Sequence, residues 1–273
     1  MEKIESTENK RVKHVIKLRD KGRARREEGL FIAEGKRWLY DAAFSDISEL
    51  YVSESFAKEN EGTGPTDDYE RSGKGEAFIV TDAVMKKMSG TETPQGVLAV
   101  LKMPAFSFEE LIKKQNPLLL FLENIQDPGN LGTVMRTAEG AGVTGVIMSR
   151  DTTDIYSPKA VRSTMGSLLR VPHVIAEDFN GTIEDAKAAG IRMYAALPDS
   201  KKRYDECDYR ASSAFIIGNE ANGIKDETAK LADTPVGIPM GGKLESLNAA
   251  MAAGILMYEA ARKRNFSGGT ETI

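Results

Sequence analysis

Between residues 118 and 240, short apolar runs alternate with stretches that have a helical pattern. The predicted helices lie at 133–141 and near 157–169. The predicted strands are LLLFLEN at 118–124, VTGVIMS at 143–149, IRMYAAL at 191–197, AFIIGN at 214–219 and PVGIPM at 235–240. Strands separated by helices are typical of parallel sheets that helices cover on both faces. The alternation therefore predicts an α/β fold with a mostly parallel sheet for this part of the chain.

The first hundred residues predict a smaller α/β domain. Apolar positions between Ile4 and Leu18 indicate a helix, and LFIAEGKRWLYDAA at 30–43 indicates a strand that runs into a helix. Further strands are predicted at 49–55, 77–82 and 92–102. We expect the domains and their flanking segments to be 1–103, a linker at 104–117 that carries two prolines, 118–266, and a disordered tail at 267–273. Residues 60–76 are poor in apolar side chains and are predicted to form an exposed loop.

Composition excludes several classes of protein. No apolar run approaches the roughly 18 to 20 residues of a membrane span, and the amino terminus lacks the apolar core of a signal peptide. We therefore expect a cytoplasmic protein. The single cysteine, Cys207, excludes an internal disulfide, and with His14 and His173 it matches no familiar zinc spacing, so no metal is expected.

The distribution of charge is uneven. The formal net charge is −4, yet nine basic residues between Lys10 and Arg26 face only one acid, Asp20. These nine residues, called the basic stripe below, are Lys10, Arg11, Lys13, Lys17, Arg19, Lys21, Arg23, Arg25 and Arg26. Such a stripe can bind phosphates even on an acidic protein, because long-range repulsion is screened within about 10 Å at moderate salt. A solvated, charged helix face is the alternative.

Gly140, Gly142 and Gly145 spell G-x-G-x-x-G, the pattern of dinucleotide-binding proteins. That pattern binds a pyrophosphate only where it follows a strand and opens a helix. Here a predicted helix precedes the glycines and a predicted strand follows them. We therefore expect a helix end and a turn.

Three segments resemble the motifs of the SpoU (TrmH-like) RNA 2′-O-ribose methyltransferases of the SPOUT superfamily. They are ENIQDPGNLGTVMRTAEGAGV at 123–143, FIIGNEANGIKDE at 215–227 and IPMGGKLESLNAAMAAGILMYEAARKR at 238–264. The resemblance implies methyl transfer from S-adenosylmethionine to a ribose 2′-hydroxyl of RNA, with 23S ribosomal RNA as the expected substrate. It also implies a deep trefoil knot in the second domain and a homodimer formed through that domain.

The resemblance extends, less specifically, to residues 9–100. NKRVK at 9–13 and FIAEGKRWLYDA at 31–42 are similar to the substrate-binding domain that precedes many catalytic domains of the family. That domain has an architecture like that of ribosomal L30e proteins. This similarity implies that the first domain binds RNA.

The family motifs assign roles to individual residues. The catalytic set implied is Asn130, Arg136, Glu220, Ser246 and Asn248. The cofactor set implied is Gly218, Ile238 and Leu247. Arg136 has two possible roles, as a base at the ribose or as a clamp on the substrate phosphate, and a guanidinium, which stays protonated in almost any site, favours the clamp. The resemblance also implies that Glu220 orients either Arg136 or the acceptor. The missing side chain of Gly218 would let the cofactor approach the backbone. Taken singly, these residues have ordinary structural roles: helix caps for Asn130, Ser246 and Asn248, a surface ion pair for Arg136, a turn glycine for Gly218, and core for Ile238 and Leu247.

Two further sets complete the expectations. Residues expected to contact RNA are Lys10, Arg11, Lys13, Arg23, Arg25, Arg26 and Arg162. Residues of the last predicted helix that are spaced for burial or subunit pairing are Met251, Ile255, Leu256 and Tyr258. Two alternative functions remain open at this point: a knotted methyltransferase that acts on a base, and a noncatalytic RNA-binding protein with a vestigial cofactor pocket.

Overall fold

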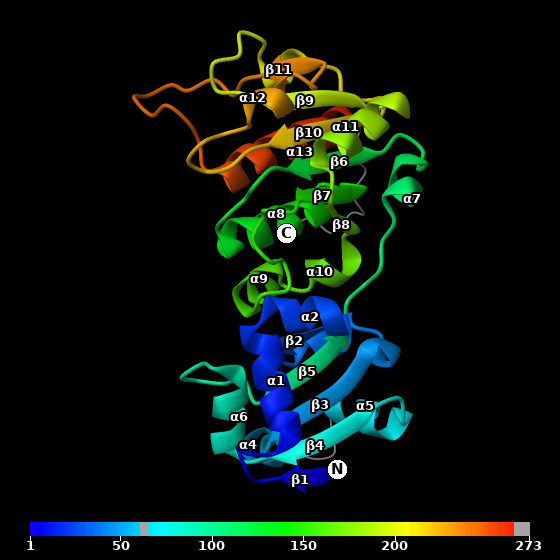
Figure 1. Ribbon diagram of the computed structural model, residues 1–273, viewed down its shortest axis with the longest axis vertical. Coiled ribbons are helices and arrows are strands. Elements are labelled where there is room, and N and C mark those ends of the chain that lie inside the picture. Colours follow the sequence, from blue (N-terminus) through cyan, green and yellow to red (C-terminus); the bar gives the residue numbers. More distant parts are fainter. Residues whose placement is uncertain (61–64, 265–273) are drawn as a thin grey trace. The chain divides into compact units, whose positions relative to one another are not determined.

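The computed structural model describes residues 1–60 and 65–264, and these form two compact units (Figure 1). The first unit contains Met1–Ala105 and Asp154–Leu169, and the second contains Phe106–Thr153 and the chain from Arg170 onward. Residues 104–117, predicted as a linker, contain the short helix α7 (Phe108–Ile112), whose Leu111 is buried. The domain boundaries expected from the sequence stay a prediction. The predicted disordered tail at 267–273 lies outside the described residues.

The first unit is built on a mixed sheet in the order β1-β4-β3-β5-β2. Its strands are β1 (Glu2–Ile4), β2 (Leu30–Glu34), β3 (Ile47–Ser53), β4 (Glu76–Val80) and β5 (Val97–Lys102). β1, β4 and β3 run parallel, whereas β5 is antiparallel to both β3 and β2. The helices are α1 (Lys10–Asp20), α2 (Gly22–Glu28), α3 (Arg37–Asp41), α4 (Glu54–Glu59), α5 (Pro65–Ser72), α6 (Asp82–Ser89) and α9 (Pro158–Thr164), with a 3-10 turn at Phe44–Asp46.

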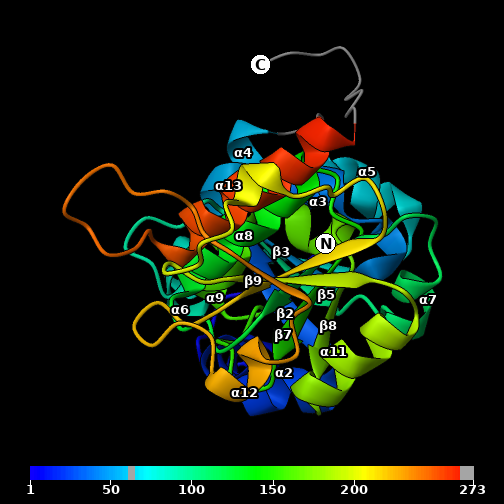
Figure 2. The ribbon, with the colours of Figure 1, turned by 90° about the horizontal axis from the view of Figure 1, so that it is seen from above.

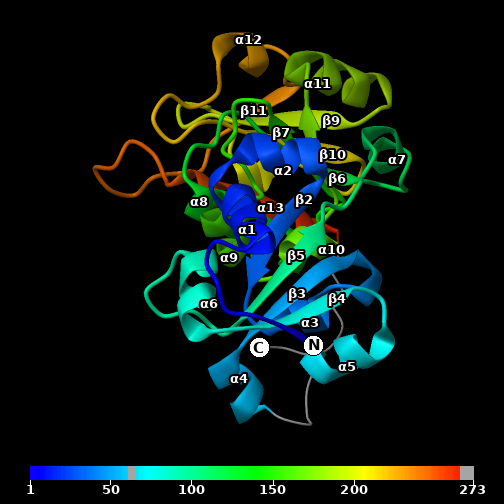
Figure 3. The same ribbon diagram turned by 60° about the horizontal axis from the view of Figure 1, so that its bottom comes forward.

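Helix α1 packs on this sheet (Figure 3), and its sequence explains where it begins and which face it buries. The Asn9 side chain accepts a hydrogen bond from the Arg11 amide and so caps the helix. Val12, Val15 and Leu18 repeat at helical spacing and are fully buried in one core with side chains of β2, β3, β4 and β5. The helix predicted from the apolar pattern is confirmed, except that Ile4 belongs to β1.

The expectation of an exposed loop at 60–76 is wrong for residues 65–72. Residues 65–72 form α5, and residues 61–64 lie outside the described part of the chain. Tyr69, the only aromatic residue in the stretch, is fully buried, and its hydroxyl donates a hydrogen bond to the carbonyl of Ile47 over 3.0 Å. One buried aromatic side chain anchors a segment whose overall composition is that of a loop.

The second unit contains a six-stranded sheet in the order β11-β9-β10-β6-β7-β8, and every neighbouring pair is parallel. The strands are β6 (Leu118–Leu122), β7 (Gly145–Ser149), β8 (His173–Ala176), β9 (Arg192–Ala196), β10 (Ser213–Ile217) and β11 (Thr234–Val236). Every residue of β6, β7 and β10 is buried, as expected for central strands with helices on both faces. The predicted α/β fold is confirmed.

Helices cover both faces of this sheet. On one face α8 (Pro128–Gly140) packs against α13 (Ala249–Lys263), which also contacts β10, and Figure 2 shows these two helices side by side. On the other face, side chains of α7 and α11 (Phe179–Ala188) share a core with β6, β7 and β9, next to the short α12 (Asp226–Ala229). The helix predicted near 157–169 is instead two short helices, α9 and α10 (Ser167–Arg170), because Met165 adopts a left-handed conformation between them.

The glycines that resemble a dinucleotide-binding pattern end a helix, as predicted. Gly140 is the last residue of α8, Gly142 has a positive φ of 68°, and Gly145 begins β7. No helix starts at this turn, so the feature on which pyrophosphate binding depends is missing here.

The loop between β9 and the next 3-10 turn (Tyr204–Glu206) closes around Gly237. The amide of Leu197 donates to Val236 O, the amide of Gly237 to Lys202 O, and the amide of Tyr204 to Gly237 O. A Cβ at Gly237 would lie 2.8 Å from the carbonyl oxygen of Ser200, so glycine is required at this crossing. Close enclosure of one segment by a loop is what a threaded chain needs, and the trefoil knot itself stays a prediction.

Across the described residues, no helix combines the length and the apolar character needed to cross a membrane.

Candidate active site

The carboxyl ends of β11, β9, β10 and β6 lie along one edge of the parallel sheet, because these strands are neighbours and point the same way. The loop 237–248 leaves β11 at this edge and reaches α13 on the side where the chain passes from β6 into α8 (Figure 1). In open α/β sheets, ligands bind outside the carboxyl ends of the strands. The three predicted motifs follow β6, β10 and β11, so all of them meet at this edge.

A chain of hydrogen bonds joins the three motifs through their side chains. The amide nitrogen Nδ2 of Asn130 donates to Glu220 Oε1 over 2.9 Å. Asn130 Oδ1 in turn accepts from Asn248 Nδ2 over 3.0 Å. Asn248 Oδ1 accepts from the amides of Ala250 and Met251, which makes Asn248 the N-cap of α13. Three of the five predicted catalytic residues therefore form one connected network.

Two capping expectations are settled by this geometry. The predicted cap role of Asn248 is confirmed, whereas Asn130 lies inside α8 and does not cap it. Asp127 is the N-cap, and its carboxylate accepts from the Asn130 amide over 2.8 Å. Because Asp127 satisfies the backbone, the Asn130 side chain is free to bridge Glu220 and Asn248.

Glu220 is held in place by backbone amides as well as by Asn130. Its Oε2 accepts from the amide of Gln126 over 3.1 Å, and its Oε1 accepts from the amide of Asp127 over 3.3 Å. Partial burial acts to raise the pKa of Glu220, but the hydrogen bonds from Asn130 and from these amides outweigh it and lower the pKa below its ordinary value. The carboxylate is therefore a fixed negative charge at neutral pH.

Gly218 is required by the loop that carries Glu220. A Cβ at Gly218 would lie 2.2 to 2.3 Å from backbone atoms of Gly223 and Ile224. Because these atoms are backbone, no side-chain rotation could relieve the clash. The loop turns back on itself through paired hydrogen bonds between the backbones of Asn219 and Gly223, and Gly223 has a positive φ of 67°. We expected a missing side chain to admit the cofactor, and the structure shows that the space at Gly218 is filled by the loop itself.

Arg136 lies apart from the network. Its side chain is exposed on α8, six residues after Asn130, and it makes no hydrogen bond or ion pair with any described residue. Glu220 therefore does not orient Arg136 in this chain, contrary to one of its two expected roles. The guanidinium remains available for a group outside the chain.

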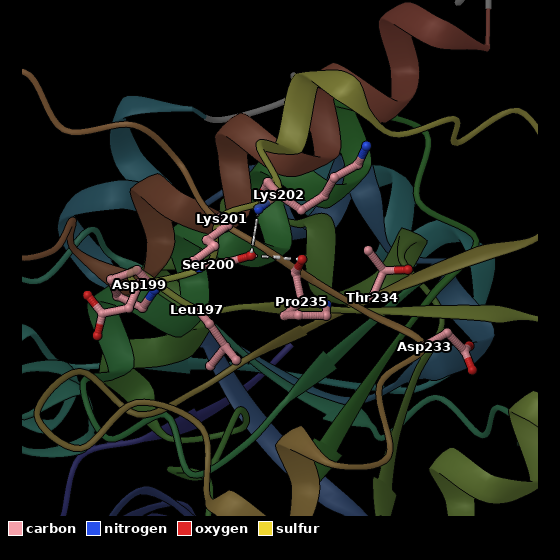
Figure 4. Close-up of a pocket in the computed structure, with 9 residues that line it drawn as sticks. Leu197, Asp199, Ser200, Lys201, Lys202, Asp233, Thr234 and Pro235 are labelled. Atoms are coloured by element: carbon pink, nitrogen blue, oxygen red, sulfur yellow. Dashed lines mark hydrogen bonds between the residues drawn. The ribbon is translucent and has the colours of Figure 1, made fainter.

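The remaining predicted site residues lie on the loop 237–248. Ile238 and Leu247 are half-buried aliphatic side chains, and Ser246 is exposed and is not a helix cap. A cavity of about 720 Å³ lies in the same unit, lined by residues 197–202 after β9 and by residues 233–235 at the start of β11. Figure 4 shows these lining residues. Ser200 donates to Pro235 O over 2.9 Å in the cavity wall, and none of the predicted cofactor residues lines the cavity.

Sequence reasoning missed Glu123, at the end of β6. This carboxylate is 3% exposed and accepts hydrogen bonds from the Lys225 amide over 2.8 Å and from Thr228 Oγ1 over 2.6 Å. Asn219 Nδ2 similarly donates to Asn124 O over 2.8 Å. These contacts tie the loop of the second motif to the start of the first. A glutamate at the end of a fully apolar strand was the signal available in the sequence.

Two of the predicted RNA contacts have side chains that form ion pairs within the fold. Arg25 is 4% exposed, donates to Arg19 O and forms an ion pair with Asp154 at 2.6 Å. Its guanidinium is therefore enclosed by its partners, and the predicted RNA contact is wrong. Arg11 is partly exposed and forms ion pairs with Glu49 and Glu76 at 2.7 and 2.8 Å, and its RNA contact stays a prediction.

Folding also neutralises much of the rest of the basic stripe. Lys13 pairs with Glu8, Lys17 with Glu28, Arg19 with Asp20 and Arg23 with Glu27. Lys10, Lys21 and Arg26 form no ion pair with any described residue. The linear sequence shows one acid within the stripe, whereas in the structure most of these partners are carboxylates that flank the stripe, and Arg11 and Arg25 pair with carboxylates of distant segments.

The last helix is only partly buried. Leu256 is fully buried and Ile255 is half-buried, while Met251 and Tyr258 remain 56% and 52% exposed on one side of α13. Burial within the chain accounts for Leu256 alone. As for metals, the described residues contain no group of three His, Cys, Asp or Glu side chains that could hold an ion.

The fold is α/β, and polar side chains of three separate motifs meet at the carboxyl ends of its parallel strands. The model of the SpoU rRNA methylase family matches residues 117–258, and that of the MRM3-like substrate-binding domain matches residues 9–99. This chain belongs to the SpoU rRNA methylase family.

Two relatives that match most of this chain have names from the same enzyme class. The 23S rRNA (guanosine(2553)-2′-O)-methyltransferase RlmP of Bacillus subtilis is 32% identical over 94% of this chain and 98% of its own length. The 23S rRNA (uridine(2479)-2′-O)-methyltransferase of Streptomyces viridochromogenes is 34% identical over 71% of this chain and 69% of its own.

Solved structures resemble this one closely. The AdoMet-bound rRNA methyltransferase of Sinorhizobium meliloti superposes with a TM-score of 0.85 at 29% identity, covering 96% of this chain and 97% of the other. AviRb of Streptomyces viridochromogenes, in complex with AdoMet, gives 0.84 at 28% identity over 95% and 99%. The predicted family, fold class, enzyme class and cofactor are confirmed.

Proposed function

We propose that this protein transfers a methyl group from S-adenosylmethionine to a ribose 2′-hydroxyl of 23S ribosomal RNA, with Asn130, Glu220 and Asn248 organising the site. The observation that carries the proposal is the hydrogen-bonded network through these three residues, one from each motif. A preorganised polar network of this kind costs no reorganisation when the substrate reacts. The 2′-O-methyltransferase names of the relatives described above favour ribose methylation over both alternative functions.

The residues at the sheet edge fit the cofactor. Half-buried Ile238 and Leu247 offer apolar surface for an adenine, and the tight loop after Gly218 presents backbone groups beside it. S-adenosylmethionine, when bound, supplies a methyl group on a sulfonium that a hydroxyl oxygen can attack. We assign Gly218, Ile238 and Leu247 to the cofactor, with Gly218 acting through the shape of its loop.

The chain's own contribution to the reaction is positioning and charge. The exposed guanidinium of Arg136 is suited to hold the phosphate next to the target ribose, because Arg presents a planar fork of donors to a phosphate. We place Ser246 beside the substrate on the exposed part of the loop 237–248. Fixing the 2′-hydroxyl in line with the methyl group supplies much of the rate enhancement in reactions of this type.

The choice of nucleotide is a finer question than the choice of RNA. The two relatives described above act on a guanosine and on a uridine, according to their names. A ribose is common to both, so the network of the catalytic unit need not read the base. We propose that the first unit selects the target region, through Lys10, Lys13, Arg23, Arg26 and Arg162. Exposed ion pairs such as Lys13 with Glu8 are weak enough for a phosphate to displace them.

We also propose that the protein is a cytoplasmic homodimer that pairs through α13. Met251 and Tyr258 lie seven residues apart on one side of the helix and are both more than half exposed, with half-buried Ile255 between them. Apolar and aromatic side chains clustered on one helix face are typical of a protein interface. A second copy of the same face would cover them.

The test is transfer of labelled methyl from S-adenosylmethionine to ribosomal and transfer RNA from a strain that lacks this protein, followed by nucleoside analysis. We expect label in one 2′-O-methylnucleoside of 23S rRNA. Label on a base would contradict the ribose assignment, and label confined to transfer RNA would contradict the substrate. The Arg136→Ala variant should bind the same RNA within a few fold and lose methyl transfer.

A further inference from the structure

A cavity of about 330 Å³ lies within the first unit, whereas the network described above belongs to the second. Three segments form it: the end of α1, the end of α6 with the turn that follows, and α9. Its lining residues are Arg19, Asp20, Ser89, Gly90, Thr91, Pro158 and Arg162. We call it the Arg162 pocket.

Two of the three charged side chains in the pocket neutralise each other. Arg19 Nε donates to Asp20 Oδ1 over 2.7 Å and Arg19 Nη2 to Asp20 Oδ2 over 2.9 Å, a two-point fork. This hydrogen bonding by Arg19 lowers the pKa of Asp20, so the pair stays ionised at neutral pH. Arg162 is exposed and makes no hydrogen bond or ion pair with the described residues. One positive charge is therefore left without a counter-charge.

The opposite wall of the pocket is polar and fixed. Ser89, which is 5% exposed, and Thr91 have hydroxyl oxygens 3.0 Å apart, and the Thr91 amide donates to Ser89 Oγ over 3.2 Å. Gly90 between them has a positive φ of 69°, and a Cβ there would lie 2.7 Å from Arg19 Nη1. Only glycine allows this turn to lie against Arg19, so two hydroxyl groups are held at one side of the pocket.

We propose that the Arg162 pocket binds a backbone phosphate of the RNA substrate, with Arg162 as the charged contact and Thr91 as a hydroxyl donor. An unneutralised guanidinium fork and nearby hydroxyls match the oxygens of a phosphodiester. The volume lies at the lower end of the range for ligand sites, which suits a single nucleotide unit. Lys21, adjacent to Asp20 and free of ion pairs with described residues, adds positive charge beside the pocket. The inference rests on the proposed RNA substrate.

Salt dependence of RNA binding tests the assignment, because each phosphate contact releases counterions. The dissociation constant for 23S rRNA fragments is measured at several KCl concentrations for wild type, Arg162→Gln and Arg71→Gln. Arg71 is a matched control: it lies on α5 of the same unit, and its side chain is 69% exposed. We expect Arg162→Gln to weaken binding about tenfold and to reduce the slope of log K against log salt by about 0.7 to 0.9. Equal constants and slopes for the two variants would overturn the proposal.

A second variant keeps the test independent of Arg162. Thr91→Glu places a carboxylate in the pocket, and with circular dichroism unchanged it should weaken RNA binding more than Arg162→Gln does. Wild-type affinity for that folded variant would count against the pocket.

The source of the phosphate and the fate of the proposed function are separated by two controls. In the first control the protein is titrated with inorganic phosphate alone. If phosphate binds at a site that depends on Arg162, and Arg162→Gln leaves the RNA affinity unchanged, the pocket is a free-anion site and the RNA assignment is overturned. The second control is methyl transfer by the wild type. If the wild type transfers methyl and the salt slope of Arg162→Gln is unchanged, the proposal for the Arg162 pocket is overturned and the proposed function is not affected. Absence of methyl transfer by wild type to any RNA removes the proposed function, and the salt slope then decides the pocket by itself.

Discussion

Asn130 and Asn248 lie 118 residues apart in the chain, yet the side chain of Asn248 donates a hydrogen bond to Asn130 Oδ1 over 3.0 Å. Asn130 uses its other polar atom to bind Glu220. Asn130 is thus the middle member of a network, and its amide suits that position because its NH2 donates to a carboxylate while its oxygen accepts from a second amide.

This relationship predicts strong coupling between the two asparagines. We expect Asn130→Ala and Asn248→Ala each to lower kcat by about 100-fold, and the double variant to lose little more than the worse single variant, because residues in one network are not additive. Steady-state kinetics on all four proteins measures this double-mutant cycle. Simple multiplication of the two losses would show that the asparagines act independently.

We predict that Glu220 makes a pH-dependent contribution to the free energy of unfolding. Its pKa is lowered in the folded state from the ordinary 4.5, so its stabilising contribution is fully present above pH 4.5 and is lost as the pH falls through the folded-state pKa. Urea unfolding of wild type and Glu220→Gln between pH 7 and pH 3 should show a free-energy difference that shrinks with acid. A difference that stays constant or grows in acid would mean that the carboxylate is not stabilised by Asn130 and the amides.

Gly218→Ala should disrupt the loop of the second motif. The added Cβ meets backbone of Gly223 and Ile224 at 2.2 to 2.3 Å, whereas a Cβ at Gly241 meets nothing within 4 Å. We expect Gly218→Ala to weaken S-adenosylmethionine binding at least tenfold and to destabilise the fold by about 2 kcal/mol, typical of strain in a packed segment. Gly241→Ala, on the exposed loop, should leave both nearly unchanged. Calorimetric titration and urea unfolding measure the two effects, and equal behaviour of the variants would contradict the clash.

We predict that Arg264 stabilises the end of α13. Its guanidinium donates to the carbonyls of Asn116, Tyr209 and Ala211 over 2.7 Å each, joining three loop positions. Arg264→Ala should cost about 2 kcal/mol in the free energy of unfolding, since two partly buried carbonyls, those of Tyr209 and Pro117, lose their donor. Arg262→Ala, an exposed residue paired with Glu259, is the control and should change unfolding far less. Similar losses for the two arginines would refute this assignment.

The exposed face of α13 predicts the oligomeric state. Tyr258→Arg and Met251→Arg place charge in the proposed interface and should convert a dimer to a monomer in light scattering, with methyl transfer falling in parallel. Tyr40→Arg, a change at a 67% exposed tyrosine of the first unit, should leave the dimer intact. A wild-type protein that is monomeric at micromolar concentration would remove the proposal.

The sequence alone predicted the elements whose signals are local. Apolar runs such as Leu118–Leu122 and AFII at 214–217 became central strands, and Asn248 became a helix cap, because the signals for both lie in residues that are neighbours along the chain. It also identified the three motifs. It missed α5, whose order depends on one buried contact between Tyr69 and a strand 22 residues away.

Only the tertiary structure decided which charges are free and which polar groups meet. Arg25 and Arg162 are alike in the sequence, yet Arg25 is buried against Asp154, 129 residues away, and Arg162 stays exposed and unpaired among the described residues. Gly218 similarly has no room for a side chain, because the backbone of Gly223 folds onto it. Ion pairs and close backbone contacts depend on distances in space between segments far apart in the chain, and local pattern carries no information about those distances.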